Sequence, residues 1–344
     1  MKKSPFSPDK FMQSLYPALR AEPYKGIDNP ADILTKSKEI AERTKVLLGT
    51  DKLGFASLTL KKIGEPLNYP EYTLQKYSVE IFEGLESAVF ILKPKNIKEK
   101  APATVALCGH GYGVRQILGI SKKGNKKHLP YIDNYQKNFA AELARRGCIV
   151  AAPELFGFGE ARLSKDLKKP FYISSCDELS HHLLPYGLTV AGVRVMQAIA
   201  CAEILLKDPD ADQNRLGIMG ISGGGLTALY SSVIDSRFAR TVVSGYINTF
   251  RSSILSMWHC PDNYIPGILA TGEIYDFAAS IAPRELLIES GTKDKLFPID
   301  AAKEAHEKIS HIYSLLGADE KLTIDVFDGK HSVSGRKSFD FLSK

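Results

Sequence analysis

The chain has 344 residues, of which 44% are apolar and 24% charged, as in an ordinary globular protein. Its 45 basic and 39 acidic residues are mixed along the chain and leave a net charge of +6, which does not indicate a nucleic-acid-binding protein. The densest basic stretch, residues 122–127, contains no aromatic residue and is expected to be a solvated loop. We therefore expect no nucleic-acid partner.

The chain termini and the cysteines indicate the expected compartment. Two lysines near the N-terminus are followed by no apolar segment, and no run reaches the roughly 18 apolar residues of a membrane span. The five cysteines are odd in number, form no CxxC pair, and three of them lie in apolar segments. We expect a cytoplasmic protein with reduced thiols, no membrane contact and no metal site.

Residues 1–75 differ in pattern from the rest and are expected to form an extension packed on a main domain of residues 76–344. A helix is predicted from Pro30 to Gly49, because Asn29 (or Asp28) can cap its start and glycine suits its end. The extension is far too short for a β-propeller of several blades with roughly 40 residues each.

From Tyr72 onward the pattern changes to strands and helices. Residues 72–80 and 85–92 flank a Glu-Gly turn and predict a hairpin. Apolar strands then alternate with helices, and the expected strands are 104–108, 148–152, 215–221, 241–245, 285–289 and 322–327. The expected helices are 136–146, 188–206, 224–234 and 298–316, with a short one at the C-terminus. This alternation predicts an α/β fold with a mostly parallel sheet and helices on both faces.

Residues 247–280 interrupt this alternation and are interpreted as an insertion. Inserted loops over the carboxyl edge of a parallel sheet often carry specificity. Trp258, His259 and Tyr264 in this insertion are therefore candidates for the lining of a substrate pocket, with simple packing of the insertion as the alternative.

The segment Gly220-Ile221-Ser222-Gly223-Gly224 carries the predicted nucleophile. The pattern GxSxG is weak alone, but here an expected strand precedes it and an expected helix follows it. A serine on such a tight turn is strained, and only small residues fit two positions before and after it. The helix directs its N–H groups and its positive dipole end toward the serine. Spacings of phosphate-binding loops are not matched, so Ser222 is the candidate nucleophile.

A serine nucleophile needs a base, and histidine is the usual one. His331 follows the last expected strand, which brings it to the same sheet edge as the serine. His306 and His311 lie on an amphipathic helix and are expected to be surface or packing residues. His181 and His182, placed in a loop before a helix, are the weaker second candidates.

The acid that orients this base is expected in the loop after the preceding strand, where Asp294 stands. The order serine, aspartate, histidine along the chain is the one associated with this type of turn. Asp325 lies within a strand, and Asp328 is close to His331 in sequence, so both are weaker candidates.

The oxyanion of a tetrahedral intermediate needs preorganised N–H donors. One is expected from the backbone of Gly223 and the second from Tyr112, with Gly111 as the alternative if the turn differs. Both Gly111 and Tyr112 follow an expected strand in a glycine-rich loop. His110 in the same loop is expected to hold the loop rather than to act as a base.

These residues resemble the α/β-hydrolase superfamily over residues 72–344. Within it, the His-Gly-Tyr element at 110–112 is similar to that of acetyl xylan esterases, which also deacetylate cephalosporin C, and the chain also resembles dienelactone hydrolase-like proteins. There are departures: Gly223 stands where the deacetylases usually have glutamine, and Ser222 where dienelactone hydrolase has cysteine. Residues 1–75 are not covered by the resemblance.

The resemblance implies a serine hydrolase that cleaves carboxylic esters of small molecules through an acyl-enzyme, with short-chain or acetyl carbohydrate esters as possible substrates and with no metal or cofactor. A prolyl-oligopeptidase-like peptidase shares the order of the three residues, but the chain lacks room for that family's propeller. A non-catalytic ligand-binding protein on the same fold is the third reading, and such proteins typically lack one of the three residues.

Overall fold

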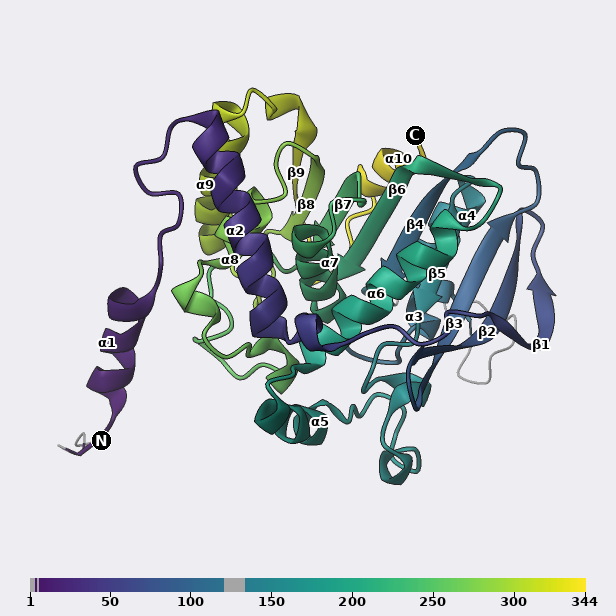
Figure 1. Ribbon diagram of the computed structural model, residues 1–344, viewed down its shortest axis with the longest axis horizontal. Coiled ribbons are helices and arrows are strands. Elements are labelled where there is room, and N and C mark those ends of the chain that lie inside the picture. The colour runs from purple at the N-terminus through teal and green to yellow at the C-terminus, as the bar shows by residue number, and fades with distance from the viewer. Residues whose placement is uncertain (1–3, 5, 121–133) are drawn as a thin grey trace.

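The computed structural model describes residue 4 and residues 6–120 and 134–344, so the basic stretch 122–127 lies outside the described residues. All nine described strands form one sheet in the order β1-β2-β3-β5-β4-β6-β7-β8-β9 (Figure 1). Neighbours from β5 to β9 are parallel, and β1, β2, β3 and β5 pair in antiparallel fashion. The expected mostly parallel sheet is confirmed.

The strands largely occupy the segments that the apolar pattern predicts. Their bounds are β1 Lys61–Asn68, β2 Tyr72–Phe82, β3 Leu85–Pro94, β4 Ala101–Leu107, β5 Ile149–Pro153, β6 Ala211–Ile221, β7 Arg240–Ser244, β8 Glu285–Gly291 and β9 Leu322–Phe327. Strands β4, β5 and β7 are buried almost throughout, as strands covered by helices on both faces must be. The predicted hairpin is β2–β3, and Gly84 in its turn has a φ of 78°.

Strand β1 was not expected from the sequence. It pairs with β2 and forms one edge of the sheet, so residues 61–75 take part in the same sheet as the rest of the chain. All but one of its residues are exposed. The proposed boundary at residue 75 therefore falls within β2.

Helices cover both faces of this sheet. The helices are α1 Asp9–Leu19, α2 Pro30–Leu48, α3 Arg115–Leu118, α4 Phe139–Arg145, α5 Cys176–Leu183, α6 Val190–Leu206, α7 Gly223–Ile234, α8 Ile274–Ala279, α9 Ile299–Leu315 and α10 Ser338–Ser343. Helices α6 and α7 pack on the central strands, and α9 packs on β8 and β9 (Figure 1). Helices α4 and α10 pack on each other and on strands β3, β4 and β5.

Helix α2 is the helix predicted before residue 50. The side chain of Asn29 accepts a hydrogen bond from the N–H of Ala31 at 2.8 Å, and Gly49 ends the helix with a φ of 78°. Its buried face includes Ile33, Ile40 and Leu48, which share a core cluster with residues of α7, α8 and α9. This part of the extension is thus packed into the main core.

Two further elements bear on the site. Residues 181 and 182 belong to helix α5, so the expectation that they lie in a loop is wrong. The insertion 247–280 contains α8 and the short 3₁₀ helices Pro261–Asn263 and Ile268–Ala270. Within the described residues no single helix meets the length and hydropathy of a membrane span; only α5 with its following turn and α6 do so together, across a bend of 94°.

Candidate active site

Ser222 lies at the turn between β6 and α7, with φ at 57° and ψ at −122°. Its N–H donates to the carbonyl oxygen of Ser244 at the end of β7, at 3.0 Å. A Cβ on Gly220 would lie 2.0 Å from the oxygen of Gly224, and one on Gly224 would lie 2.1 Å from the oxygen of Leu107. The glycines two positions before and after Ser222 are therefore required by backbone contact, and the turn holds the serine in a left-handed conformation that favours glycine.

Asp294 and His331 follow β8 and β9, two strands that neighbour each other in the sheet. Nδ1 of His331 lies 2.7 Å from Oδ2 of Asp294. The other carboxylate oxygen of Asp294 accepts from the N–H groups of Leu296 at 2.8 Å and Phe297 at 3.1 Å. Because every carboxylate oxygen has a partner, the buried Asp294 side chain is fixed and holds the imidazole of His331 in one orientation.

The second ring nitrogen of His331, Nε2, is the candidate proton acceptor. Nε2 is buried and has no hydrogen-bond partner among the described residues. A Cβ on Gly245, which follows the Ser244 that binds the backbone of Ser222, would lie 3.2 Å from Cε1 of His331. The imidazole and the backbone of Ser222 thus both lie near the end of β7, and Nε2 is a candidate proton acceptor.

Two aromatic rings that were not predicted as site residues fix the position of this imidazole. The ring of Phe297 lies 5.7 Å from that of His331 and the ring of Tyr135 lies 5.8 Å from it, both nearly parallel. The hydroxyl of Tyr135 donates to the carbonyl oxygen of His110 at 2.5 Å. Tyr135 thus connects the histidine to the loop after β4. No local sequence pattern marks Tyr135 as a site residue, because it lies far from His110 and His331 in the chain.

The loop after β4 is held by two glutamines. The N–H of Tyr112, the predicted second oxyanion donor, donates to Oε1 of Gln116 at 3.2 Å. The N–H of Gly109 donates to Oε1 of Gln136 at 2.9 Å, and the Gln136 amide donates to Gln116 at 2.7 Å. Gly223, the first predicted donor, is the first residue of α7, whose leading N–H groups have no partner within the helix.

Glu154, the residue directly after β5, binds the same loop. Its carboxylate accepts from the N–H of Val114 at 3.0 Å. A Cβ on Gly113 would lie 2.2 Å from Oε1 of Glu154. Burial raises the pKa of Glu154 to about 7, and the backbone hydrogen bonds limit the rise.

His110 is joined to a buried ion pair. Nε2 of His110 lies 3.1 Å from Oδ2 of Asp262, and Arg194 donates to the same oxygen at 2.5 Å. Burial by itself would lower the pKa of His110, but the Asp262 carboxylate outweighs it and raises that pKa to about 9. A Cβ on Gly223 would lie 3.0 Å from Cε1 of His110, so this group borders the predicted oxyanion site.

The three candidates for a substrate pocket have different surroundings. Trp258 is 83% exposed. The hydroxyl of Tyr264 donates to the carbonyl oxygen of Ile254, and Tyr264 borders one hollow within the insertion and another between the insertion, α5 and α6. His259 is buried, and its ring packs edge-on against Phe297 at 5.7 Å. Of the three, His259 alone shares a neighbour, Phe297, with His331.

No protein-family model matches the chain. Several solved structures, however, are similar to it in fold. A candidate acetyl xylan esterase of Bacteroides fragilis NCTC 9343 superposes with a TM-score of 0.79 at 16% identity, over 94% of this chain and 82% of that one. The chain has the α/β-hydrolase fold. The expected likeness to acetyl xylan esterase structures is confirmed.

Two further structures and one sequence are similar to this chain. Acetyl xylan esterase 1 of Thermoanaerobacterium sp. JW/SL YS485 has a TM-score of 0.57 at 16% identity, covering 96% of this chain and 97% of that one. Methylesterase BT1017 has a TM-score of 0.69 at 21% identity, covering 96% of this chain and 66% of that one. A candidate hydrolase of Bacillus subtilis, YtaP, is 22% identical over 239 residues, which are 68% of this chain and 74% of its own length.

Proposed function

We propose that this protein is a serine hydrolase that cleaves carboxylic esters. The observation that carries the proposal is the Asp294–His331 pair at 2.7 Å, which follows strands parallel to the one that ends at Ser222, a serine held at positive φ on a strand-to-helix turn. Serine is a weak nucleophile at neutral pH and needs such an oriented base. The hydrolase and esterase names of the similar proteins support the same reaction class.

The proposed reaction follows from this geometry. Oγ of Ser222 attacks the ester carbonyl carbon while Nε2 of His331 takes the hydroxyl proton. Asp294 stabilises the imidazolium, and the N–H of Gly223 stabilises the oxyanion. The N–H of Tyr112 could join it only by giving up its hydrogen bond to Gln116. The C–O bond breaks as His331 returns the proton to the leaving alcohol. A water molecule then hydrolyses the acyl-enzyme with the same base.

The test of the nucleophile uses a short-chain nitrophenyl ester. Ser222→Ala should lower kcat/KM by roughly 10⁴-fold or more, because the oriented base then has no hydroxyl to activate. The exposed Ser57 provides the control, and Ser57→Ala should leave turnover unchanged. A fluorophosphonate probe should label the wild-type protein and spare Ser222→Ala. Near-normal turnover by Ser222→Ala, or no labelling of the wild type, contradicts the proposal.

Within the esters, we propose short acyl groups, with acetylated sugars as the first class to assay. Support comes from the two similar structures named as acetyl xylan esterases, while the methylesterase makes methyl esters the natural comparison. A panel that varies the acyl length and includes acetyl sugars and methyl esters tests this. Preference for long acyl chains or for methyl esters contradicts it.

A peptidase is a weaker proposal for this site. All nine described strands belong to one sheet, so the described part of the chain holds no second β-domain that would enclose a peptide. Peptide substrates assayed beside acetyl esters distinguish the two activities.

A further inference from the structure

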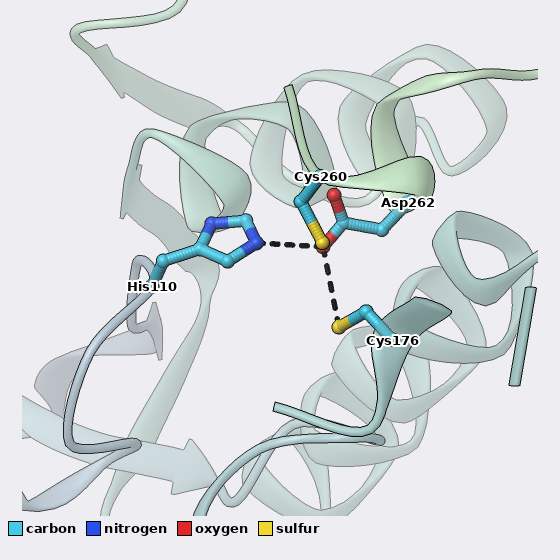
Figure 2. A group of neighbouring side chains, drawn as sticks. All are labelled: His110, Cys176, Cys260 and Asp262. Carbon is cyan, nitrogen blue, oxygen red and sulfur yellow. Dashed lines mark hydrogen bonds and ion pairs between the residues drawn. The ribbon is translucent and has the colours of Figure 1, made fainter. Parts of the chain in front are cut away.

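Four side chains with metal-binding atoms converge beside the proposed active site. They are His110, Cys176, Cys260 and Asp262, and Figure 2 shows them turned toward a common centre. His110 comes from the loop after β4, Cys176 begins α5, and the other two lie in the insertion. The chain thus brings together three segments that are remote in sequence.

The spacing of the ligand atoms fits one ion. One nitrogen, two sulfurs and one carboxylate oxygen all lie within 4.8 Å of one another. Nε2 of His110 is 3.1 Å from Oδ2 of Asp262, and Sγ of Cys176 is 3.7 Å from that oxygen. Tetrahedral zinc, with bonds of about 2.0 to 2.3 Å, places its ligand atoms about 3.3 to 3.8 Å apart. Small side-chain shifts would complete the tetrahedron.

The burial of these side chains also favours a bound cation. Cys176 and Asp262 are almost fully buried, and the buried Nε2 of His110 lies 3.1 Å from Oδ2 of Asp262, an atom of the same cluster. Thiolates and a carboxylate buried together are costly without compensating positive charge, which a metal ion would supply. The free thiols of Cys176 and Cys260 are the soft ligands that zinc prefers.

The surroundings supply outer support and balance the charge. Arg194 donates to Oδ2 of Asp262 at 2.5 Å and lies 2.9 Å from Sγ of Cys176, while Asn263 donates to Oδ1 of Asp262 at 2.7 Å. Such outer contacts orient the ligands of metal sites. Two thiolates and one carboxylate carry three negative charges, which the Arg194 guanidinium and one divalent cation neutralise.

We propose that His110, Cys176, Cys260 and Asp262 bind one zinc ion in a structural site. Four protein ligands leave no open position for substrate, as in structural rather than catalytic zinc sites. Binding displaces the protons of the two thiols, which pass to solvent. The cysteines form no short-spaced pair in the sequence, which predicts no metal site, and the ligand set exists only in the folded chain.

The site would link the insertion and α5 to the loop after β4. His110 borders Gly223, since a Cβ on that glycine would lie 3.0 Å from Cε1 of the histidine. The ion would therefore fix the wall of the proposed oxyanion site without contacting substrate. This inference does not depend on the ester-cleaving activity.

Cobalt(II) is the probe, because it reports its ligands by absorption. The full chain, purified with reductant and stripped with chelator, should bind one cobalt ion per chain. The spectrum should show thiolate-to-cobalt charge transfer in the ultraviolet and tetrahedral bands in the visible, both lost when zinc is added. Zinc alone should raise Tm by several degrees, because it binds only the folded state.

Matched cysteine variants locate the site. Cys260→Ser should lose most of the charge-transfer band and most of the zinc-induced rise in Tm. Cys201→Ser is the control, because Cys201 is buried on α6 outside the cluster, and it should bind cobalt like the wild type. Circular dichroism establishes that both variants fold. If Arg194 is the only cation of this cluster, the wild type will give no thiolate–cobalt band and no zinc-dependent rise in Tm, and this result would overturn the proposal. An unchanged cobalt band in Cys260→Ser would overturn it as well.

Discussion

At the scale of single residues, the proposed nucleophile depends on glycines that no other residue can replace. A Cβ on Gly224 would lie 2.1 Å from the backbone oxygen of Leu107, which belongs to a central strand and cannot yield. We expect Gly224→Ala to destabilise the protein by about 3 kcal/mol or more, at the upper end of overpacking effects. Thermal unfolding measures it. Gly54→Ala is the control, since a Cβ there meets nothing within 4 Å; equal Tm values for the two variants contradict the expectation.

Tyr135 contributes to the site through two separable contacts. Its hydroxyl binds the carbonyl oxygen of His110, and its ring lies against His331. Tyr135→Phe should lower kcat for a short-chain ester roughly tenfold, because it leaves an unsatisfied carbonyl that costs about 1–3 kcal/mol in the loop after β4. Tyr135→Leu should lower kcat further, because His331 also loses its ring contact. Equal rates in the two variants would show that the ring contact is unimportant.

The sequence predicts some of these residues and not others for a physical reason. Ser222, Asp294 and His331 each follow a strand, so their common edge can be inferred from chain order. Tyr135 and Asp262 act through contacts with segments far away in the chain, and nothing in their local pattern marks them. Such residues emerge only from tertiary structure.

At the scale of elements, apolar periodicity predicted the strands and helices of the buried sheet closely. Strand β1 was not predicted, because its residues are exposed at a sheet edge and include Gly64 and Pro66, which favour turns. Helix α5 was not predicted, because it is short. Strand β1 has no buried face and so leaves no periodic signal, whereas α5 buries Cys176, Leu179 and Ser180 but is only 8 residues long.

Helix α9 carries a titratable group on its buried face. Burial lowers the pKa of His306 to about 4, and its ring lies 3.2 Å from the hydroxyl of Ser290 in β8. The unfolded chain binds this proton near pH 6.5, so stability is lost as the pH falls from about 6.5 toward 4. Between pH 7 and pH 5 the loss from His306 should be about 2 kcal/mol.

Urea unfolding at the two pH values measures this effect. His306→Gln should lose less stability than the wild type between pH 7 and pH 5, by about that amount. His311 lies exposed on the same helix, and His311→Gln should behave like the wild type. An unchanged pH dependence in His306→Gln would show that the folded protein accommodates the charge.

At the scale of the whole molecule, helix α2 belongs to the core that supports the nucleophile. It packs on α7, the helix that begins after Ser222. Ile40 is 2% exposed, and Ile40→Ala should destabilise the protein by about 2–5 kcal/mol. Leu34 on the outer face is 39% exposed, and Leu34→Ala should change the unfolding free energy by less than about 1 kcal/mol. Similar losses in both variants would mean that α2 does not pack as described.

The exposed position of Trp258 has a spectroscopic consequence. It is the single tryptophan of the chain and lies in the insertion, with 83% of its surface in solvent. Its fluorescence should already be red-shifted in the native protein, so unfolding will move the emission maximum little and is better followed by circular dichroism. The same indole is a local reporter: a ligand that covers the insertion should shift its emission to the blue, while ligands bound elsewhere leave it unchanged.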